Sequence, residues 1–375
     1  MSHTFTRDTL LSSASLVADR LMKLVKPENE ETLASKGETA GYFKRDFGMQ
    51  EWDWPQGIGI YGLSALMDAS HTDTYTDYMI QWYRQNLERG LPARNINTTA
   101  PLLALRDLLV KHPDPELEAL CTDWADWLMH DLPRTEEDGF QHVTTHSHDR
   151  NKLSLHENQL WIDTIFMTVL FLNRMGQDYQ REDWTQESIR QVLLHIKYRW
   201  ERESGLFYHG WTFTERSHFG KVFWCRGNSW FTAGIPIFLE QFKTPLPSSV
   251  ETILLDTWKA QVKALCALQG TDGLWHTVLD DDTSYTEVSG SAAIAAGILH
   301  GIRNGLIDRS YQEYAERAID AVLANIAEDG TVLHVSGGTG IGMDKDHYRN
   351  ILIAPMAYGQ SLTLLAIAEA LRFEE

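Results

Sequence analysis

The sequence alternates between two kinds of helical segment, and this alternation restricts the fold more than any other feature. Segments of the first kind begin with small or polar residues and then become apolar on nearly every side. They occur at residues 57–67, 100–109, 163–172, 229–239, 290–302 and 355–371. Their starts lie 43, 63, 66, 61 and 65 residues apart, which leaves room for a helix, a turn and a second helix.

Segments of the second kind are amphipathic and lie between those of the first kind. They occur at residues 9–25, 75–88, 115–130, 183–198, 250–268 and 311–327. A helix that is apolar all round must be buried, whereas an amphipathic helix can cover it and face water. The sequence therefore predicts an all-α protein, an (α/α)6 toroid with an inner and an outer ring, formed by a single domain over residues 1–375.

An open helical solenoid is the alternative, because it also stacks helix pairs at a fixed period. Its terminal repeats would need polar caps, and the last inner segment is as apolar as the others, which favours a closed ring. Strand signals are weak and local, at residues 205–211, 273–279 and 330–335. We expect these to form hairpin-like loops at one mouth of the toroid.

Charge and cysteine usage exclude several classes of partner. Thirty-three Lys and Arg against 52 Asp and Glu give a formal net charge of −19, which repels phosphate backbones and argues against nucleic acid. Three widely spaced cysteines form neither a disulfide framework nor a zinc knuckle. With no secretion signal and no membrane-spanning segment in the sequence, we expect a cytoplasmic protein without membrane partners, of undetermined oligomeric state.

The loops that precede the inner helices carry the candidate functional residues. In such a ring these loops should gather around one cavity, where helix N-termini favour anions. They combine aromatic, amide, imidazole and guanidinium groups with one prominent carboxylate, which is typical of a carbohydrate pocket. The candidates are Trp54, Asn97, Asp163, His209, Trp211, Trp224, Arg226, Trp230, Ser289 and Ser291.

Asp163 is the candidate catalytic residue, because it is a lone carboxylate flanked by apolar residues at the start of an inner helix. Burial would raise its pKa and the helix N-terminus would lower it, so the sign of the shift is open. A plain helix cap is the structural alternative. His209 could donate a proton and Arg226 could bind a carboxylate; the alternative for His209 is a satisfied loop histidine, and a lone arginine is usually structural.

We expect no metal ion and no cofactor. The run His146-Ser147-His148-Asp149 has donor types that a metal accepts, but no further ligand is spaced to complete a site, so it is interpreted as a solvated polar loop. The run Asp280-Asp281-Asp282 lacks the glycine and distal glutamate of a calcium loop and is interpreted as a surface turn.

Three of the candidate runs occur in the order of a known family. They are Trp-Ile-Asp-Thr-Ile-Phe-Met at 161–167, Tyr-His-Gly-Trp at 208–211 and Trp-Cys-Arg-Gly-Asn-Ser-Trp at 224–230. With the six-hairpin pattern, they resemble glycoside hydrolase family 105, the unsaturated rhamnogalacturonyl hydrolases, which are related to the unsaturated glucuronyl hydrolases of family 88. The resemblance covers the chain from about residue 52 to residue 369.

The resemblance implies an intracellular hydrolase that acts on acidic, unsaturated oligosaccharides. Such enzymes remove a 4,5-unsaturated uronic acid from the non-reducing end of fragments made by polysaccharide lyases, here of the pectin or rhamnogalacturonan type. They hydrate the double bond instead of attacking the anomeric carbon. The residue matching Asp163 protonates C4 and then activates the water that attacks C5.

The resemblance also assigns roles around Asp163. It places His209 near the substrate, gives Trp224 and Trp230 stacking surfaces, and makes Arg226 a candidate for the uronate carboxylate. One position departs from the pattern: the related family 88 enzymes have a second important Asp before the second inner helix, where this sequence has Asn97, which cannot ionise.

Three other functions compete. An inverting glycosidase acting on saturated sugars would need a second carboxylate facing Asp163, such as Asp53 or Glu287. A sugar epimerase would need paired histidines, and His209 has no evident partner in the sequence. A non-enzymatic helical scaffold would give no reason for Trp, Asn and Arg to gather before the inner helices.

Overall fold

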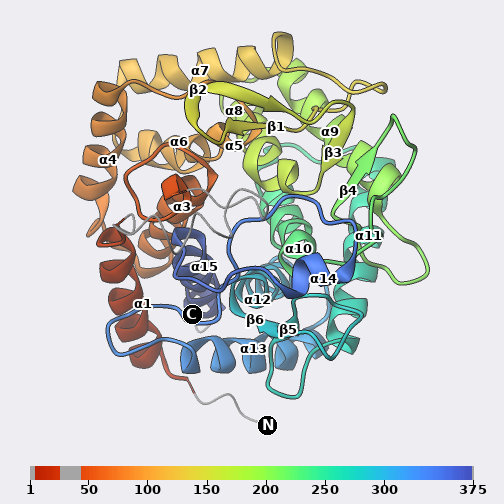
Figure 1. Ribbon diagram of the computed structural model, residues 1–375. Coiled ribbons are helices and arrows are strands. Elements are labelled where there is room, and N and C mark those ends of the chain that lie inside the picture. Colours follow the sequence, from red (N-terminus) through yellow and green to blue (C-terminus); the bar gives the residue numbers. More distant parts are fainter. Residues whose placement is uncertain (1–4, 26–43, 374–375) are drawn as a thin grey trace.

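The computed structural model describes residues 5–25 and 44–373, which form two concentric rings of helices. Figure 1 looks along the axis of the toroid, with the outer ring at the rim. The inner ring consists of α3 (Trp54–Ser70), α6 (Pro101–Lys111), α8 (Leu170–Asp178), α10 (Cys225–Glu240), α12 (Val288–Arg303) and α15 (Ala357–Phe373). The outer ring consists of α1 (Arg7–Met22), α4 (Thr76–Arg89), α7 (Pro115–His130), α9 (Glu182–Arg199), α11 (Ser248–Ala267) and α13 (Gln312–Ala324). The predicted (α/α)6 fold is confirmed.

The two rings are buried to different degrees, as the sequence pattern predicts. Every residue of α12 from 288 to 302 is buried, so this helix has no face toward water. On α4 the buried residues, among them Met79, Trp82 and Tyr83, share one face. The apolar core therefore lies between the rings, and the outer helices separate it from solvent.

The inner ring is closed, because its first and last helices pack directly on each other. α3 lies beside α15 in Figure 1. A Cβ atom on Gly62 of α3 would lie 2.7 Å from the Cα of Ser361 of α15, so only glycine permits this approach. The Ser361 hydroxyl also donates a hydrogen bond to the Ile58 carbonyl across the same seam. These contacts exclude the open solenoid.

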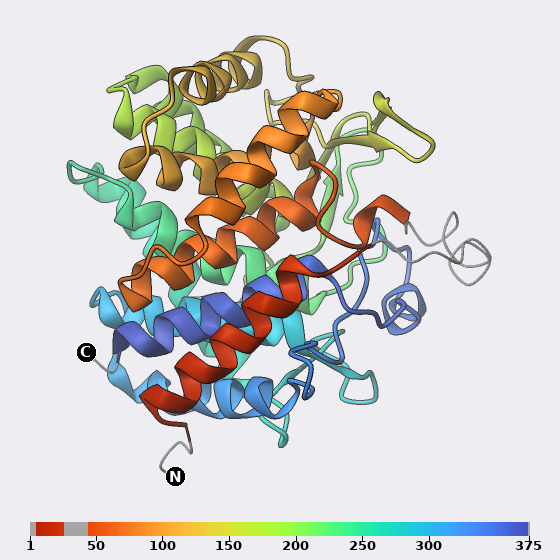
Figure 2. The same ribbon diagram turned by 90° about the vertical axis from the view of Figure 1, so that its left-hand side faces the viewer.

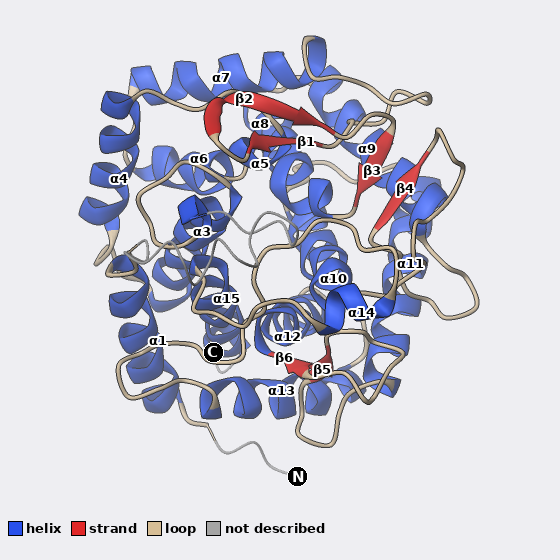
Figure 3. Ribbon diagram, in the orientation of Figure 1, coloured by secondary structure: helices blue, strands red, loops and turns tan. Residues whose placement is uncertain are grey.

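The strands and the long connections lie at one end of the toroid, on the right of Figure 2. The strands, red in Figure 3, form three antiparallel pairs in the described part of the chain. They are β1 (Val143–His146) with β2 (Asp149–Leu155), β3 (Gln159–Trp161) with β4 (Gly210–Thr212), and β5 (Trp275–His276) with β6 (Thr286–Glu287).

The strand predictions are only partly confirmed. The signal at 205–211 overlaps β4 and the signal at 273–279 contains β5, whereas the signal at 330–335 is wrong as a strand: its Val332 forms one isolated bridge, to Ile326. The longest hairpin, β1–β2, is absent from the sequence expectations. The run from His146 to Asp149, expected to be a solvated loop, forms its turn, with His146 paired to Asp149.

Short helical elements occupy the connections. They are η1 (Lys44–Asp46), α5 (Ile96–Thr99), the π-helical η2 (Ile165–Val169), η3 (Arg309–Tyr311) and α14 (Lys345–Arg349). Asn95 begins α5 with a capping box: its side chain accepts from the Asn97 and Thr98 N–H groups, while the Thr98 hydroxyl accepts from the Asn95 N–H. Among the described residues, no helix has both the length and the apolar character needed to span a bilayer.

Candidate active site

A cavity of about 320 Å³ opens at the end of the toroid that carries the strands. Its wall includes the N-terminal ends of α3 and η2, the β1–β2 hairpin and the loop around Gly338. Four of the ten sequence candidates line it: Trp54, Asn97, Asp163 and Trp224. Three histidines surround its inner end, of which two, His142 and His156, are in the wall.

Asp163 lies at the inner end of this cavity, where β3 passes into the helical stretch that continues through η2 and α8. The Ile162 N–H donates to the His209 carbonyl at 3.0 Å, which joins the Asp163 segment to the run containing β4. One carboxylate oxygen of Asp163, Oδ1, accepts a hydrogen bond from Trp230 Nε1 at 3.2 Å. The other, Oδ2, lies 3.3 Å from His209 Nε2. Because its side chain is 18% exposed, the carboxylate can reach a ligand in the cavity.

A chain of polar groups fixes the orientation of His209. The Gly342 N–H donates to the Tyr348 hydroxyl at 3.0 Å, and this hydroxyl lies 2.8 Å from His209 Nδ1. Because the Tyr348 hydroxyl already accepts from Gly342, its own hydrogen is free to donate to Nδ1, and the hydrogen of neutral His209 is then on Nε2. That hydrogen faces Asp163 Oδ2. Tyr348 thereby selects the tautomer that points a donor at the carboxylate.

The pKa values of this pair are shifted in the same direction. Burial opposes ionisation of Asp163, but the contacts with His209 and the nearby His142 outweigh it, so the pKa of Asp163 lies below its usual value. Burial lowers the pKa of His209 below 6.5, although Asp163 acts against that shift. At neutral pH the resting pair is therefore a carboxylate and a neutral imidazole.

Two further histidines and a tryptophan complete the inner wall. His142 stacks face to face on Trp161, with ring centroids 4.0 Å apart and planes inclined by 5°. His156 lies 4.7 Å from the same tryptophan. Burial, and then the neighbouring His156, hold the pKa of His142 well below its usual value. His142 could not be identified from the sequence, because no local motif marks a histidine that a tryptophan nineteen residues later in the chain will cover.

Three aromatic rings in tilted and edge-on contact lie behind Asp163 at the inner end of the cavity. Trp230 packs against Phe166 at 5.2 Å between centroids, and Phe166 contacts Tyr61 edge-on at 5.7 Å. These three residues are called the aromatic floor below. Tyr61 in turn lines a second cavity, of about 360 Å³, that opens among the C-terminal halves of the inner helices. Trp230 is fully buried, so here it orients Asp163 and offers no free ring face.

Trp54 and Trp224 provide the aromatic surface of the cavity itself. Trp54 stacks on Tyr358 with ring centroids 4.5 Å apart. Trp224 lies 4.5 Å from His209. Both rings are supported from behind, which leaves their positions fixed before a sugar ring arrives.

Besides His209 and Trp230, which lie against Asp163, four more candidates lie outside the cavity wall. Arg226 is fully buried and donates to the Ser336 carbonyl at 2.9 Å and to the Gly337 carbonyl at 2.6 Å. The Ser289 hydroxyl donates to the Glu287 carboxylate at 2.6 Å. The Ser291 hydroxyl donates to the Glu287 backbone carbonyl, also at 2.6 Å. Trp211 stacks on Tyr198, at 5.3 Å between centroids.

Asp53 and Glu287, the two candidates for a second catalytic carboxylate, both form hydrogen bonds within the protein. Glu287 is fully buried, caps α12 through the Ser289 and Gly290 N–H groups, and lies 3.6 Å from Arg226. Asp53 is in the cavity wall, but it caps α3 at the Trp54 N–H and accepts from the Thr145 hydroxyl, both at 2.8 Å. Burial raises the pKa of Asp53 despite nearby Arg45.

Comparison with known proteins finds relatives over nearly the whole chain. The sequence model described as Glycosyl Hydrolase Family 88 matches residues 30–374. The unsaturated rhamnogalacturonyl hydrolase YesR of Bacillus subtilis is 31% identical over 334 residues, which are 88% of this chain and 92% of YesR.

Solved structures agree with this match. A possible member of glycoside hydrolase family 105 from Salmonella enterica serovar Paratyphi A superposes with a TM-score of 0.90 at 33% identity, covering 100% of this chain and 97% of that one. The unsaturated glucuronyl hydrolase of Bacillus sp. GL1 superposes with a TM-score of 0.69 over 96% of each chain. Its identity is 17%, so this second likeness concerns the fold alone.

Proposed function

This chain belongs to glycosyl hydrolase family 88, and from that premise we propose that its pocket removes a 4,5-unsaturated uronic acid from the non-reducing end of lyase-generated oligosaccharides. The bond to the neighbouring sugar breaks indirectly, after water has added across the C4–C5 double bond. The similarity to YesR favours fragments of the pectin or rhamnogalacturonan type.

The observation that carries the proposal is the Asp163 carboxylate, which faces the cavity between two side-chain donors, Trp230 and His209. Ordinary inverting and retaining glycosidases use two carboxyl groups on opposite sides of the scissile bond. Here Asp163 faces the cavity, whereas both oxygens of Asp53 accept hydrogen bonds from the protein. Vinyl-ether hydration needs one group that first gives and then takes a proton, and Asp163 can do both in turn.

Asp163 carries out both proton transfers of the reaction. Its carboxylic acid gives a proton to C4, and positive charge develops at C5, where the ring oxygen shares it. The resulting carboxylate takes a proton from water while the water oxygen bonds to C5, so Asp163 ends protonated as it began. The hemiketal at C5 opens to a ketone, which leaves a hemiacetal at C1 that releases the neighbouring sugar.

The resting state must gain a proton before this sequence begins, because the pKa of Asp163 is lowered in the free protein. A bound uronate places a second negative charge in the cavity and excludes water. Both changes favour the neutral form of Asp163. His209 lies 3.3 Å from the carboxylate and can pass it a proton through Nε2. The Asp163–His209 pair carrying one extra proton is therefore the reactive form.

The other candidates act from the wall or from behind it. Trp54 stacks on the sugar ring, the almost fully buried Trp224 supports the wall beside it, and Asn97 orients the substrate where related enzymes have an Asp. Arg226, which was expected to bind the uronate carboxylate, is fully buried and does not line the cavity. In the present geometry its guanidinium supports Ser336 and Gly337, next to the wall residue Gly338, so we propose that it acts on the substrate through this loop.

The proposal is tested with unsaturated disaccharides, by following the loss of absorbance of the conjugated double bond. Asp163→Asn should keep the fold and lose about 10²–10⁴-fold in kcat, the usual contribution of a general acid or base. A variant with near wild-type kcat would remove Asp163 from the mechanism. In ¹⁸O water, label at C5 is expected, whereas label at the anomeric carbon would indicate ordinary glycoside hydrolysis.

We also propose that the enzyme works in the cytoplasm. Cys121, Cys225 and Cys266 are free thiols, all buried, which suits a reducing compartment. Fractionation of the native host, with the enzyme assayed in each fraction, tests this location.

A further inference from the structure

The β1–β2 hairpin extends the cavity wall outward from Asp163. Along β1 and the turn, His142 is buried, Thr144 and Ser147 are half-buried, and His148 is exposed. All four line the same cavity as Asp163. Since the aromatic floor lies behind the inner end, the part of a substrate beyond its terminal sugar leaves through the open end, where this hairpin forms part of the wall.

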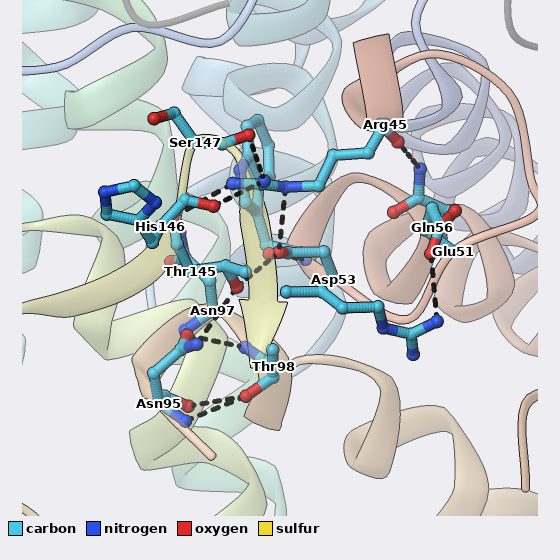
Figure 4. Close-up of polar contacts among 12 residues, drawn as sticks. Arg45, Glu51, Asp53, Gln56, Asn95, Asn97, Thr98, Thr145, His146 and Ser147 are labelled. Atoms are coloured by element: carbon cyan, nitrogen blue, oxygen red, sulfur yellow. Dashed lines mark hydrogen bonds and ion pairs between the residues drawn. The ribbon is translucent and has the colours of Figure 1, made fainter. Parts of the chain in front are cut away.

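Arg45 holds the turn of this hairpin in place (Figure 4). Its guanidinium donates to three successive carbonyls, those of Thr145 at 2.9 Å, His146 at 2.7 Å and Ser147 at 3.0 Å. One guanidinium that binds three carbonyls fixes the path of the turn more tightly than a lysine could, because its donors form a rigid planar fork.

The hairpin is also tied to the helix starts that carry the inner wall. The Thr145 hydroxyl donates to Asp53, the cap of α3, at 2.8 Å and accepts from the Asn95 side chain at 3.1 Å. Asn95 begins α5, where Asn97 faces the cavity. Arg45 itself lies 3.9 Å from Asp53. Figure 4 shows these side chains as one connected group between the hairpin and the two helices.

The charge of this wall restricts the sugar that can lie against it. Among the described residues that line the cavity, Arg45 is the one lysine or arginine, and its two terminal guanidinium nitrogens donate to the hairpin carbonyls. The wall otherwise presents hydroxyls and imidazoles, with carboxylates nearby at Asp46 and Asp53. Such a surface hydrogen-bonds a neutral sugar and repels an anionic one.

We propose that the β1–β2 hairpin forms the subsite for the leaving sugar, that this subsite selects an uncharged sugar, and that Arg45 is its positioning residue. This inference rests on the proposed function, because it concerns the sugar next to the unsaturated uronate. It gives a function to the histidine-containing turn, which takes no part in the chemistry at Asp163.

The test compares two substrates that share the reacting sugar and differ in the leaving group. One is the unsaturated uronyl-rhamnose disaccharide, and the other is the methyl glycoside of the same unsaturated uronate. Arg45→Gln should raise KM for the disaccharide about tenfold with kcat little changed, since it frees the turn that contacts the leaving sugar. KM for the methyl glycoside should stay at the wild-type value. Arg45→Lys should fall between wild type and Arg45→Gln.

Two further variants keep the result interpretable. Arg134→Gln is the matched control, because Arg134 also donates to backbone carbonyls, those of Leu128 and Met129, away from this cavity. It should show no dependence on the leaving group. If Arg45→Gln does not fold, His148→Ala on the exposed turn is used, with the same expected dependence on the leaving group at a smaller magnitude.

Selection by charge is measured with the same disaccharide bearing a sulfate on the rhamnose. The wild-type enzyme should show kcat/KM at least about tenfold lower for the sulfated form. The inference is overturned if Arg45→Gln affects both leaving groups equally or neither, or if the sulfated substrate is used as well as the neutral one. A wild-type enzyme inactive on every unsaturated substrate would instead overturn the proposed function, and this inference with it.

Discussion

Replacing Tyr348 with phenylalanine tests whether the orientation of His209 matters to the reaction. The change removes one hydroxyl from a fully buried ring and leaves its volume nearly intact. The lost hydroxyl accepts from the Gly342 N–H at 3.0 Å and bonds His209 Nδ1 at 2.8 Å. A buried hydrogen bond contributes about 0.5–1.5 kcal/mol net, so the variant should lose about 1–3 kcal/mol in its free energy of unfolding.

The kinetic effect follows from the tautomer. Without the Tyr348 hydroxyl, His209 no longer needs to keep its hydrogen on Nε2, facing Asp163. An energy of about 1.4 kcal/mol corresponds to tenfold in an equilibrium, so we expect kcat about tenfold to a hundredfold lower. The hydroxyl bonds the neutral imidazole, so its loss should also raise the pKa of His209. The falling limb of the pH profile of kcat/KM should therefore move to higher pH.

The matched control is Tyr83→Phe, which removes one buried hydroxyl bonded to the Pro101 carbonyl at 2.7 Å. It should lower the free energy of unfolding by about 1 kcal/mol and leave both kcat and the pH profile unchanged. Unfolding is followed in urea and turnover by the double-bond absorbance over a series of pH values. If Tyr348→Phe matches this control in kcat and in the position of the limb, the reasoning about the tautomer is refuted.

Three other outcomes are expected. In the wild-type enzyme, kcat/KM should fall as pH rises through a value below 6.5, because burial lowers the pKa of His209 and the pair then loses its extra proton; a profile flat to pH 8 would contradict this assignment. His300 lies 3.1 and 3.3 Å from two glutamates, and although burial acts against it, these carboxylates raise its pKa. The contribution of protonated His300 to the free energy of unfolding is therefore complete below pH 6.5 and is lost as the pH rises through the raised pKa. His300→Gln should lower the free energy of unfolding by about 1–3 kcal/mol in acid and by less in alkali, measured by urea unfolding at each pH. Arg226→Lys should lower kcat/KM by a similar factor for a uronate substrate and for its methyl ester, since the guanidinium supports the loop at Ser336; a penalty confined to the charged substrate would show direct binding of the carboxylate.

The rings of helices could be predicted from the sequence because burial alone determines their pattern. A helix such as α12, buried from Val288 to Ile302, has to be apolar on every side, and that property is visible in the sequence. The closure at Gly62 and Ser361 also agrees with the apolar last segment. These features depend on composition along one helix, which needs no knowledge of the neighbours.

The β1–β2 hairpin could not be predicted in this way. β2 has the sequence Asp-Arg-Asn-Lys-Leu-Ser-Leu and is largely exposed, so it lacks the apolar alternation that marks a strand. Its turn is fixed by Arg45, about one hundred residues earlier in the chain. A contact over that separation leaves no local signal.

The residues of the candidate site also fall into those that could be predicted from the sequence and those that could not. Asp163, Trp54 and Trp224 could be identified because a carboxylate or an aromatic ring at an inner-helix start faces the cavity by position. For Arg226, the sequence gives the charge but not the direction of the guanidinium, which here donates to Ser336 and Gly337. The direction of a side chain depends on hydrogen-bond acceptors that the fold brings from distant parts of the chain.

The aromatic floor has a consequence for how the enzyme meets a polymer. Trp230, Phe166 and Tyr61 separate the cavity of Asp163 from the second cavity at the other end of the toroid. A polysaccharide therefore cannot thread through the ring, and only a chain end can enter. Both products have to leave by the entrance that admitted the substrate, so each turnover ends in complete dissociation. Each lyase-generated fragment carries one unsaturated end, so it loses one sugar and then has no end on which the enzyme can act again: the amount of uronate released should equal the number of fragments, whatever their length.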